Sequence, residues 1–158
     1  MSNNFVYLTK EKLVELESQL KEMKTHGRQE AARKIAEARS HGDLSENSEY
    51  DAAKEEMGML ELRIAQLEQT LTRTRVLDPT EVRTDKVYIF SKVQLLDMLS
   101  DKKIEYQLVS TEEADIVKGK ISTDSPIGKS LLGKVVGEVV SVKVPAGMKQ
   151  YKILEIGK

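Results

Sequence analysis

The sequence predicts an α + β protein with an N-terminal antiparallel α-helical coiled-coil hairpin, residues 1–78, followed by a small antiparallel sheet domain with one short helix, residues 79–158. Two observations predict this division. From Thr9 to about Thr74 the chain has almost no helix breakers, and no proline occurs before Pro79. Beyond Pro79, short runs rich in Val, Ile and Tyr alternate with Asp, Ser, Gly and Pro, which is typical of strands and turns.

Apolar residues in the helical part recur in steps of three and four, the spacing of a coiled-coil seam. The second half carries them at Tyr50, Ala53, Met57, Leu60, Ile64, Leu67 and Leu71. The first half carries them at Leu13, Leu16, Leu20 and Met23 and, after one additional step of four, at Gly27, Ala31, Ile35 and Ala38. We expect the additional step to unwind the supercoil locally.

The two halves mirror each other about one point. If the chain folds back between positions 43 and 44, Leu20 lies opposite Leu67 and Gly27 lies opposite Leu60. The seams then meet in register within one chain. The pattern therefore predicts an antiparallel hairpin rather than a parallel dimer, and a monomer is expected because the hairpin covers its own seam.

The segment at this fold point contains the residues of greatest chemical interest. Gly42 suits a helix end, and Asp43 or Ser45 suits the N-cap of the next helix. Asp43 and Glu46 have the spacing of a capping box, so a structural role is one interpretation. Their carboxylates could also share one Mg²⁺, which takes one or two protein carboxylates and completes its shell with water and phosphate oxygens. Such a pair binds metal weakly alone and suits a site that another macromolecule completes.

In the second part, five runs are predicted as strands: Lys86–Phe90, Val93–Leu99, Ile104–Val109, Glu138–Val144 and Gln150–Ile156. A short helix is predicted between the third and fourth of them. Ser125 suits its N-cap, Pro126 its first position and Gly133 its end.

Composition excludes several kinds of site. The chain has no Cys, and its two histidines, His26 and His41, are not spaced as metal ligands. The net charge is only -1, but six acids and one base lie between Asp43 and Glu56, which favours cations or a basic partner there. No signal region or membrane span is visible, so a cytoplasmic protein is expected.

Two segments stand out as motifs: residues 36–50, AEARSHGDLSENSEY, and residues 124–134, DSPIGKSLLGK. The first is similar to the hairpin tip, and the second to the C-terminal signature, of the GreA/GreB family of transcript cleavage factors. The resemblance covers nearly the whole chain and implies an FKBP-like fold for the second domain. The bases of the first arm alternate with acids, which favours the GreA branch over the GreB branch. These bases are Arg28, Arg33, Lys34 and Arg39.

The resemblance implies a factor that stimulates another enzyme and binds no cofactor alone. The hairpin is expected to enter the secondary channel of a backtracked bacterial RNA polymerase. There Asp43 and Glu46 would act as the catalytic pair, helping the polymerase to hold a second Mg²⁺ and to cleave the 3′ segment of the nascent RNA. Arg39, Asn47 and Tyr50 would support the tip, although Tyr50 also begins the seam, where core packing is the simpler role.

Asp124, Ser125 and Pro126 are implied to dock on the rim of the polymerase channel, although a helix start alone also explains them. A prolyl isomerase activity would rest on the fold alone, and few aromatic residues are present to build such a pocket. Two alternatives stay open for the whole chain. One is a paralogous channel binder that inhibits the polymerase, and the other is a coiled-coil interaction protein without a chemical role.

Overall fold

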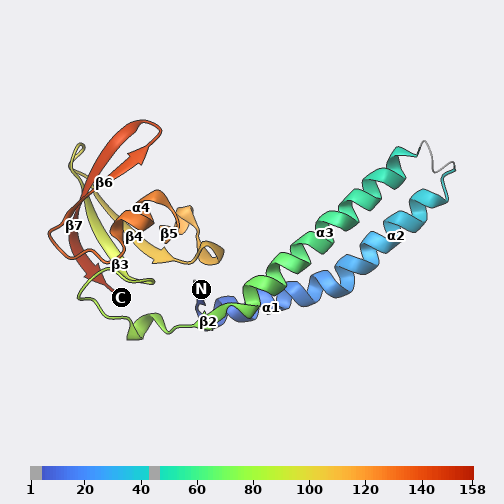
Figure 1. Cartoon of the computed structure of the whole chain (residues 1–158), viewed down its shortest axis with the longest axis horizontal. Coiled ribbons are helices and arrows are strands. Elements are labelled where there is room, and N and C mark those ends of the chain that lie inside the picture. The colour runs from blue at the N-terminus through green and yellow to red at the C-terminus, as the bar shows by residue number, and fades with distance from the viewer. Residues whose placement is uncertain (1–4, 43–46) are drawn as a thin grey trace. The chain divides into compact units, whose positions relative to one another are not determined.

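The computed structural model describes residues 5–42 and 47–158 (Figure 1). The described residues form two compact units. One is the hairpin, Glu11–Thr74, and the other combines residues 5–10 with Arg75–Lys158. None of the helices in these described ranges is long and apolar enough to cross a membrane.

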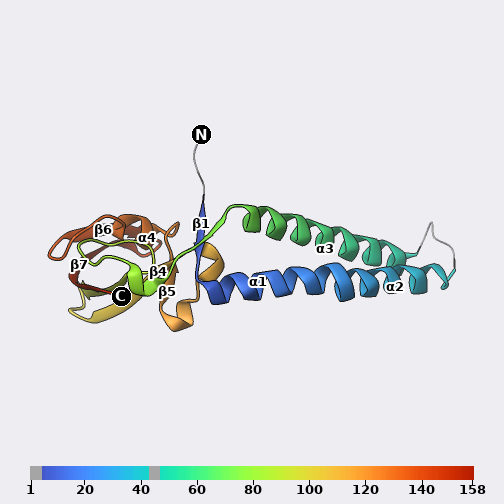
Figure 2. The same cartoon turned by 90° about the horizontal axis from the view of Figure 1, so that it is seen from below.

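The hairpin has two arms that lie side by side in both Figure 1 and Figure 2. The first arm is a continuous run of α1 (Lys10–Glu22), a π-helical turn η1 (Met23–Gly27) and α2 (Arg28–Arg39). The second arm is α3 (Ser48–Thr72). The predicted antiparallel hairpin is therefore confirmed.

The apolar positions predicted for the seam form the interface between the arms. Every one of them is buried or half-buried, and Ile64 is the most deeply buried, with 2% of its surface exposed. Large apolar side chains off the seam, such as Met59 and Leu62, are about half exposed, at 51% and 50%. A Cβ atom on Gly27 would lie 3.4 Å from Leu60 Cδ1, as expected from the predicted pairing of these two residues.

The additional step in the first arm coincides with the π-helical turn η1. Here the backbone N–H of Arg28 donates to the carbonyl oxygen of Met23, five residues earlier. This turn takes up one more residue than an α-helical turn. The local unwinding expected from the sequence therefore takes the form of a π turn, and the seam continues in phase on both sides of it.

The second unit is built on a five-stranded sheet with the strand order β5-β4-β3-β7-β6. Its strands are β3 (Lys92–Asp97), β4 (Lys103–Val109), β5 (Lys120–Ser122), β6 (Val139–Val144) and β7 (Gly147–Gly157). The short helix is α4 (Pro126–Leu131), and three 3-10 turns are η2 (Pro79–Glu81), η3 (Thr111–Glu113) and η4 (Ile116–Lys118). A separate two-stranded sheet pairs β1 (Val6–Leu8) with β2 (Thr74–Val76).

The predicted α + β class is confirmed, but the sheet differs from the predicted one. The pairing of β4 with β5 is parallel, with Leu108 opposite Ile121, so the sheet is mixed rather than wholly antiparallel. The strand β5 was not predicted because it has only three residues. Its direction follows from the connection after β4, which contains η3 and η4 and returns the chain to the same end of the sheet.

The predicted strand Lys86–Phe90 is wrong, because this run forms a turn instead. The N–H of Ser91 donates to Tyr88 O over 3.1 Å, and Ser91 Oγ accepts from the N–H of Tyr88 over 2.9 Å. Phe90 has a φ of 70°, which no strand residue adopts. Val87 and Phe90 are nonetheless 1% exposed, so burial rather than strand formation explains the apolar character of this run.

The core of the second unit lies between the sheet and α4. Fully buried side chains from three strands and the helix meet there: Val93, Leu95, Leu108, Leu131 and Ile153. The helix approaches β5 so closely that a Cβ atom on Gly128 would lie 2.1 Å from Ser122 O. Only glycine fits at this position, which fixes where the loop before α4 lies.

We expect Ile64→Ala to destabilise the hairpin by about 2–5 kcal/mol, because it leaves a cavity in the middle of the seam. The matched control Leu62→Ala removes an exposed side chain of similar size and should change stability by less than about 0.5 kcal/mol. Urea denaturation followed by helical circular dichroism measures both changes. Equal losses for the two variants would contradict the assignment of the seam.

Candidate functional site

The hairpin tip lies between the end of α2 at Arg39 and the start of α3 at Ser48. Asp43 and Glu46, the predicted catalytic and metal-binding pair, lie outside the described residues. Residues 39–42 and 47–50 are described on either side of them. Gly42 has a φ of +122°, in the range that favours glycine, as expected for the end of the first arm.

Asn47 joins the two arms at the tip. Its Oδ1 accepts from the N–H of Tyr50 over 3.1 Å, which makes Asn47 the N-cap of α3. Its Nδ2 donates over 2.6 Å to the carbonyl oxygen of Ala38, at the end of the first arm. The prediction that Asp43 or Ser45 caps this helix is therefore wrong, because the amide of Asn47 satisfies the helix start and reaches the other arm as well.

A second cross-arm contact lies beside Asn47. His41 Nδ1 is 2.6 Å from Glu49 Oε2, although both side chains are well exposed. Hydrogen bonding to Glu49 and its negative charge raise the pKa of His41 above its ordinary value of 6.5, because both favour the imidazolium. The two residues are eight positions apart in the chain. This pair and the Asn47–Ala38 hydrogen bond therefore both join the end of the first arm to the start of the second.

Tyr50 is half-buried at the first seam position and lies close to two cations. The guanidinium carbon of Arg39 is 5.6 Å from the centre of its ring, and Lys54 Nζ is 5.4 Å from it. Both distances are in the range of cation–π interactions. Hydrogen bonding to Arg39 and the charge of Lys54 lower the pKa of Tyr50, because they stabilise the phenolate. The predicted supporting residues Arg39 and Tyr50 therefore contact each other.

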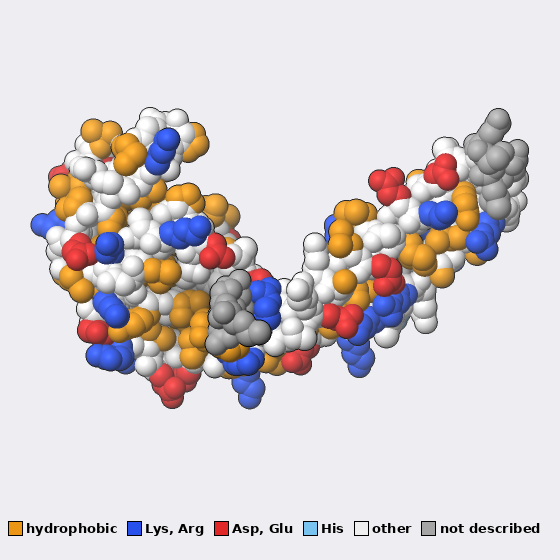
Figure 3. Space-filling model, in the orientation of Figure 1, with side chains coloured by type: hydrophobic (Ala, Val, Ile, Leu, Met, Phe, Trp, Pro, Cys, Tyr) orange, Lys and Arg blue, Asp and Glu red, His pale blue; other side chains and the backbone are white. Residues whose placement is uncertain are grey.

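Three of the four bases that alternate along the first arm are paired with hairpin acids. Arg28 makes two hydrogen bonds to Glu61 at 2.9 and 3.0 Å, and Lys34 lies 3.1 Å from Glu56. Arg33 contacts Glu30 and Glu37 on its own arm, at 2.6 and 2.7 Å. On the face shown in Figure 3, basic and acidic side chains are correspondingly interspersed along the hairpin. These bases form no continuous positive stripe on the described arms.

Among the described residues, no group of three or more His, Asp or Glu side chains could hold a metal ion. The described part of the tip therefore holds no such site by itself, and the predicted pair Asp43 and Glu46 lies outside it. Any metal bound through that pair needs further ligands, because two carboxylates alone do not fill the shell of Mg²⁺.

The predicted docking residues lie together at the start of α4. Ser125 Oγ accepts from the N–H of Gly128 over 3.1 Å and donates to Ser122 O over 2.6 Å, and Pro126 occupies the first turn. Asp124 Oδ2 accepts from Thr111 Oγ1 over 3.3 Å. Asp124 and Pro126 are exposed. The loop is thus held rigidly while two of its three predicted docking side chains face solvent.

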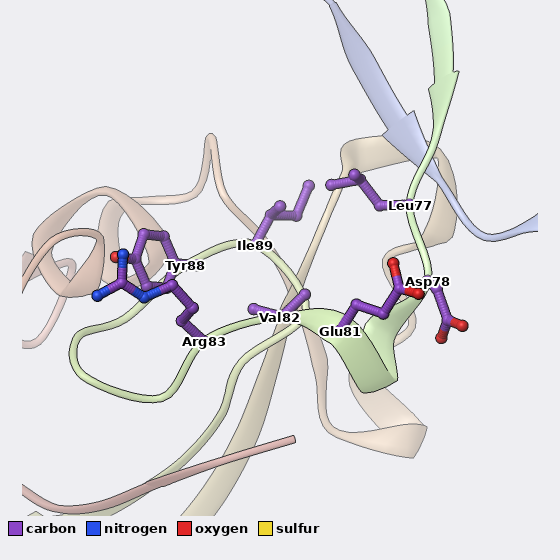
Figure 4. A pocket seen from close by; sticks show the side chains of 7 residues that line it. All are labelled: Leu77, Asp78, Glu81, Val82, Arg83, Tyr88 and Ile89. Atoms are coloured by element: carbon purple, nitrogen blue, oxygen red, sulfur yellow. The ribbon is translucent and has the colours of Figure 1, made fainter.

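A pocket at the beginning of the second unit is shown in Figure 4. Leu77, Val82 and Ile89 form its apolar part. Its Asp78 carboxylate accepts from the N–H and the hydroxyl of Thr80, at 2.9 and 2.7 Å, and these bonds lower the pKa of Asp78. This carboxylate starts the turn η2, so its arrangement is explained by local structure.

Comparison with known proteins identifies the class. Residues 6–76 match the family described as "Transcription elongation factor, N-terminal", and residues 82–158 match "Transcription elongation factor, GreA/GreB, C-term". The chain belongs to the GreA/GreB family of transcription elongation factors. The resemblance inferred from the tip and from the C-terminal signature is therefore confirmed.

Individual relatives support the GreA branch. The chain is 54% identical over 153 residues to transcription elongation factor GreA of Chlorobium phaeobacteroides, and 96% of each protein is covered. It is 53% identical over 150 residues to GreA of Chloroherpeton thalassium, with 95% of each covered. Among solved structures, GreA factor homolog 1 (Gfh1) of Thermus thermophilus is 34% identical, with a TM-score of 0.44 over 98% of this chain and 100% of that one.

Sequence reasoning missed three residues at the tip: His41, Glu49 and Lys54. Their side chains make the cross-arm pair and one of the two cation contacts to Tyr50. The acidic segment was noted as a whole, but its partner on the other arm was not. The signal was available, because folding the chain near position 43 brings position 41 close to the start of the second arm.

We expect Asn47→Ala to destabilise the hairpin by about 1 kcal/mol or more, because it removes an N-cap. Asn47→Asp is the matched variant, as it keeps an acceptor for the N–H of Tyr50 but loses the donor to Ala38. Its stability should therefore fall between those of the parent and Asn47→Ala in urea denaturation. If Asn47→Asp were as unstable as Asn47→Ala, the cap would contribute nothing.

Replacing Glu49 by Gln should lower the pKa of His41 toward 6.5, because the charged partner is lost. NMR titration of the imidazole C–H protons measures this directly. Since the folded-state pKa is raised, the stabilisation by this pair is fully present below about pH 6.5 and is lost as the pH rises through the raised value. An unchanged His41 titration in Glu49→Gln would show that the pair does not form in solution.

Proposed function

We propose that this chain rescues backtracked bacterial RNA polymerase in the cytoplasm by inserting its hairpin tip into the polymerase's secondary channel. It would act as a monomer and stimulate the polymerase's own cleavage of the RNA 3′ segment rather than cleave RNA alone. Family membership supports a role in transcription elongation. The observation that carries the proposal is the tip itself, where Asn47 and the His41–Glu49 pair join the arms on either side of the acids Asp43 and Glu46.

The form of the hairpin suits insertion into a channel. The helix α3 has 25 residues, which corresponds to a length of about 37 Å. The apolar seam is covered by the two arms of the same chain, and exposed ion pairs join the arms on the outside of the hairpin. Such an arm needs no support from a globular core along its length, because its apolar surface is covered within the hairpin.

The donor set of the tip fits Mg²⁺ only in a complex. Asp43 and Glu46 offer carboxylate oxygens, which Mg²⁺ prefers, but two carboxylates alone do not fill its coordination shell. We therefore infer that the polymerase and the RNA phosphate supply the remaining ligands. A metal held in this way would stabilise the attacking and leaving oxygens of the phosphodiester displacement.

The remaining tip residues have supporting roles in this proposal. Asn47 fixes the start of α3, and Arg39 contacts the ring of Tyr50. In the second unit, Asp124, Ser125 and Pro126 would dock on the rim of the channel. The support for docking is that Asp124 and Pro126 are exposed on a loop that Ser125 and Gly128 hold in place.

The first test uses stalled, backtracked elongation complexes with labelled RNA. Adding the protein and Mg²⁺ should shorten the transcripts, and Asp43→Ala or Glu46→Ala should reduce cleavage by at least about 100-fold, if each carboxylate acts on the metal in the transition state. Both variants should still compete with the parent for the polymerase. Gel analysis of the labelled transcripts measures the cleavage rate.

Glu55→Ala is the control for this test, because it removes an exposed acid from the same segment. It should cleave like the parent. If Asp43→Ala and Glu46→Ala also cleave like the parent, the assignment of the tip acids is wrong. If the parent binds but blocks elongation without cleavage, the chain is an inhibitor, and if it does not bind, the hairpin has another partner.

Docking is tested separately with Pro126→Ala. This change should weaken binding to the polymerase several-fold, because it removes an exposed contact, while Ser125 still caps α4. Fluorescence anisotropy of labelled protein with core polymerase measures the affinity, and circular dichroism checks the fold. An affinity equal to that of the parent would remove Pro126 from the docking surface.

A further inference from the structure

The turn η4 displays two apolar side chains that touch almost nothing. Ile116 is 84% exposed and Val117 is 96% exposed. Among the large apolar residues that the structure describes, Val117 has the most exposed side chain. Both belong to the second unit, in the connection between β4 and β5.

The backbone that carries these side chains is firmly held. Asp115 and Lys120 exchange two hydrogen bonds of 2.9 Å across the base of the turn. Within the turn, the N–H of Gly119 donates to Ile116 O over 3.0 Å, and Gly119 adopts a φ of +73°. The carbonyl of Gly119 accepts from the N–H of Gln107 on β4 over 2.9 Å. The turn is therefore a closed, anchored loop rather than a loose segment.

Rigid backbone and β-branched side chains make a good anchor for a partner. Ile and Val have restricted χ1 angles, so little rotamer freedom remains to be lost when they are buried. The side chains that contribute most to binding at an interface lie in desolvated pockets of the partner, and an aliphatic side chain gains transfer free energy when it enters such a pocket. In the isolated chain, by contrast, the exposure of both residues leaves their apolar surface in water.

The turn η4 lies close to the predicted docking loop along the chain. Only the strand β5 stands between them, and it has three residues and spans about 10 Å. At its far end Ser122 Oγ lies 2.8 Å from Thr111 Oγ1 and accepts from the N–H of Asp124 over 3.0 Å. Both η3 and η4 contact β5, which lies next to α4 in Figure 1. One partner can therefore reach the turn and Asp124–Pro126 at the same time.

We propose that Ile116 and Val117 form a second anchor for RNA polymerase and insert into an apolar socket on the surface that also receives Asp124–Pro126. This inference rests on the proposed function, since the polymerase is the partner. The two parts of the surface have different chemistry. The docking loop offers a carboxylate and a proline ring, whereas the turn offers aliphatic side chains only.

The test measures the affinity of labelled protein for polymerase elongation complexes by fluorescence anisotropy. Ile116→Ser and Val117→Ser should each weaken binding by roughly tenfold, because each removes the transfer free energy of one buried aliphatic group. The fold should be unaffected, as neither side chain packs in the free protein. Circular dichroism and thermal unfolding of each variant verify this.

Leu99→Ser is the matched control. Leu99 is 89% exposed and lies in the turn at the opposite end of β4, after β3. Like η4, this turn is held by hydrogen bonds, since Asp97 Oδ1 accepts from the N–H groups of Leu99 and Ser100 at 3.0 and 3.3 Å. The control should bind like the parent. If it weakens binding as much as Ile116→Ser, exposed apolar area in general matters and the inference is overturned.

Other outcomes also decide the matter. If both Ile116→Ser and Val117→Ser bind polymerase as tightly as the parent, the second anchor is overturned, while transcript cleavage by the parent would still support the proposed function. If the parent protein itself stimulates no cleavage, the proposed function is rejected instead. Sedimentation of the protein alone covers the remaining case: a dimer that Val117→Ser dissociates would make the turn a surface for a second copy and would overturn the inference.

Discussion

The apolar seam between the two arms is the interaction on which the hairpin and its tip depend. Most of the stability of a helix in a protein comes from the tertiary packing of its apolar face, so each arm depends on the other. Alanines at the seam, Ala31, Ala38 and Ala53, are buried and let the arms approach closely near the tip, while Ile64 fills the seam further away. The exposed ion pairs that cross the arms add orientation more than stability, because water screens them.

The tip extends this principle to polar groups. Once the seam brings the arms together, Asn47 can satisfy the start of one helix and the end of the other with a single amide. The His41–Glu49 pair and the contact of Arg39 with Tyr50 follow from the same closeness. None of these groups forms a reactive centre by itself. They hold the ends of the segment that carries Asp43 and Glu46, which fits a factor that completes another enzyme's site.

The second unit uses glycine and hydroxyl groups to keep its surface loops rigid. Gly128 permits α4 to lie against Ser122, and Ser125 caps the helix at the same place. Gly119 closes the neighbouring turn that displays Ile116 and Val117. Loops fixed in this way lose little entropy when they bind, so they can present a small number of exposed side chains to a partner effectively. The described surface loops of this unit thus suit the recognition of a partner.

The sequence by itself determined the hairpin, its register, the site of the π turn and the start of α4, because these depend on local spacing of apolar residues and on capping chemistry. Only the tertiary structure decided the rest. The run Lys86–Phe90 has strand-like composition but turns at Phe90, since burial against the core and the hydroxyl of Ser91 outweigh propensity. Two further features likewise depend on partners elsewhere in the chain. The parallel strand β5 pairs with β4, and the cap residue Asn47 donates to Ala38 O on the opposite arm.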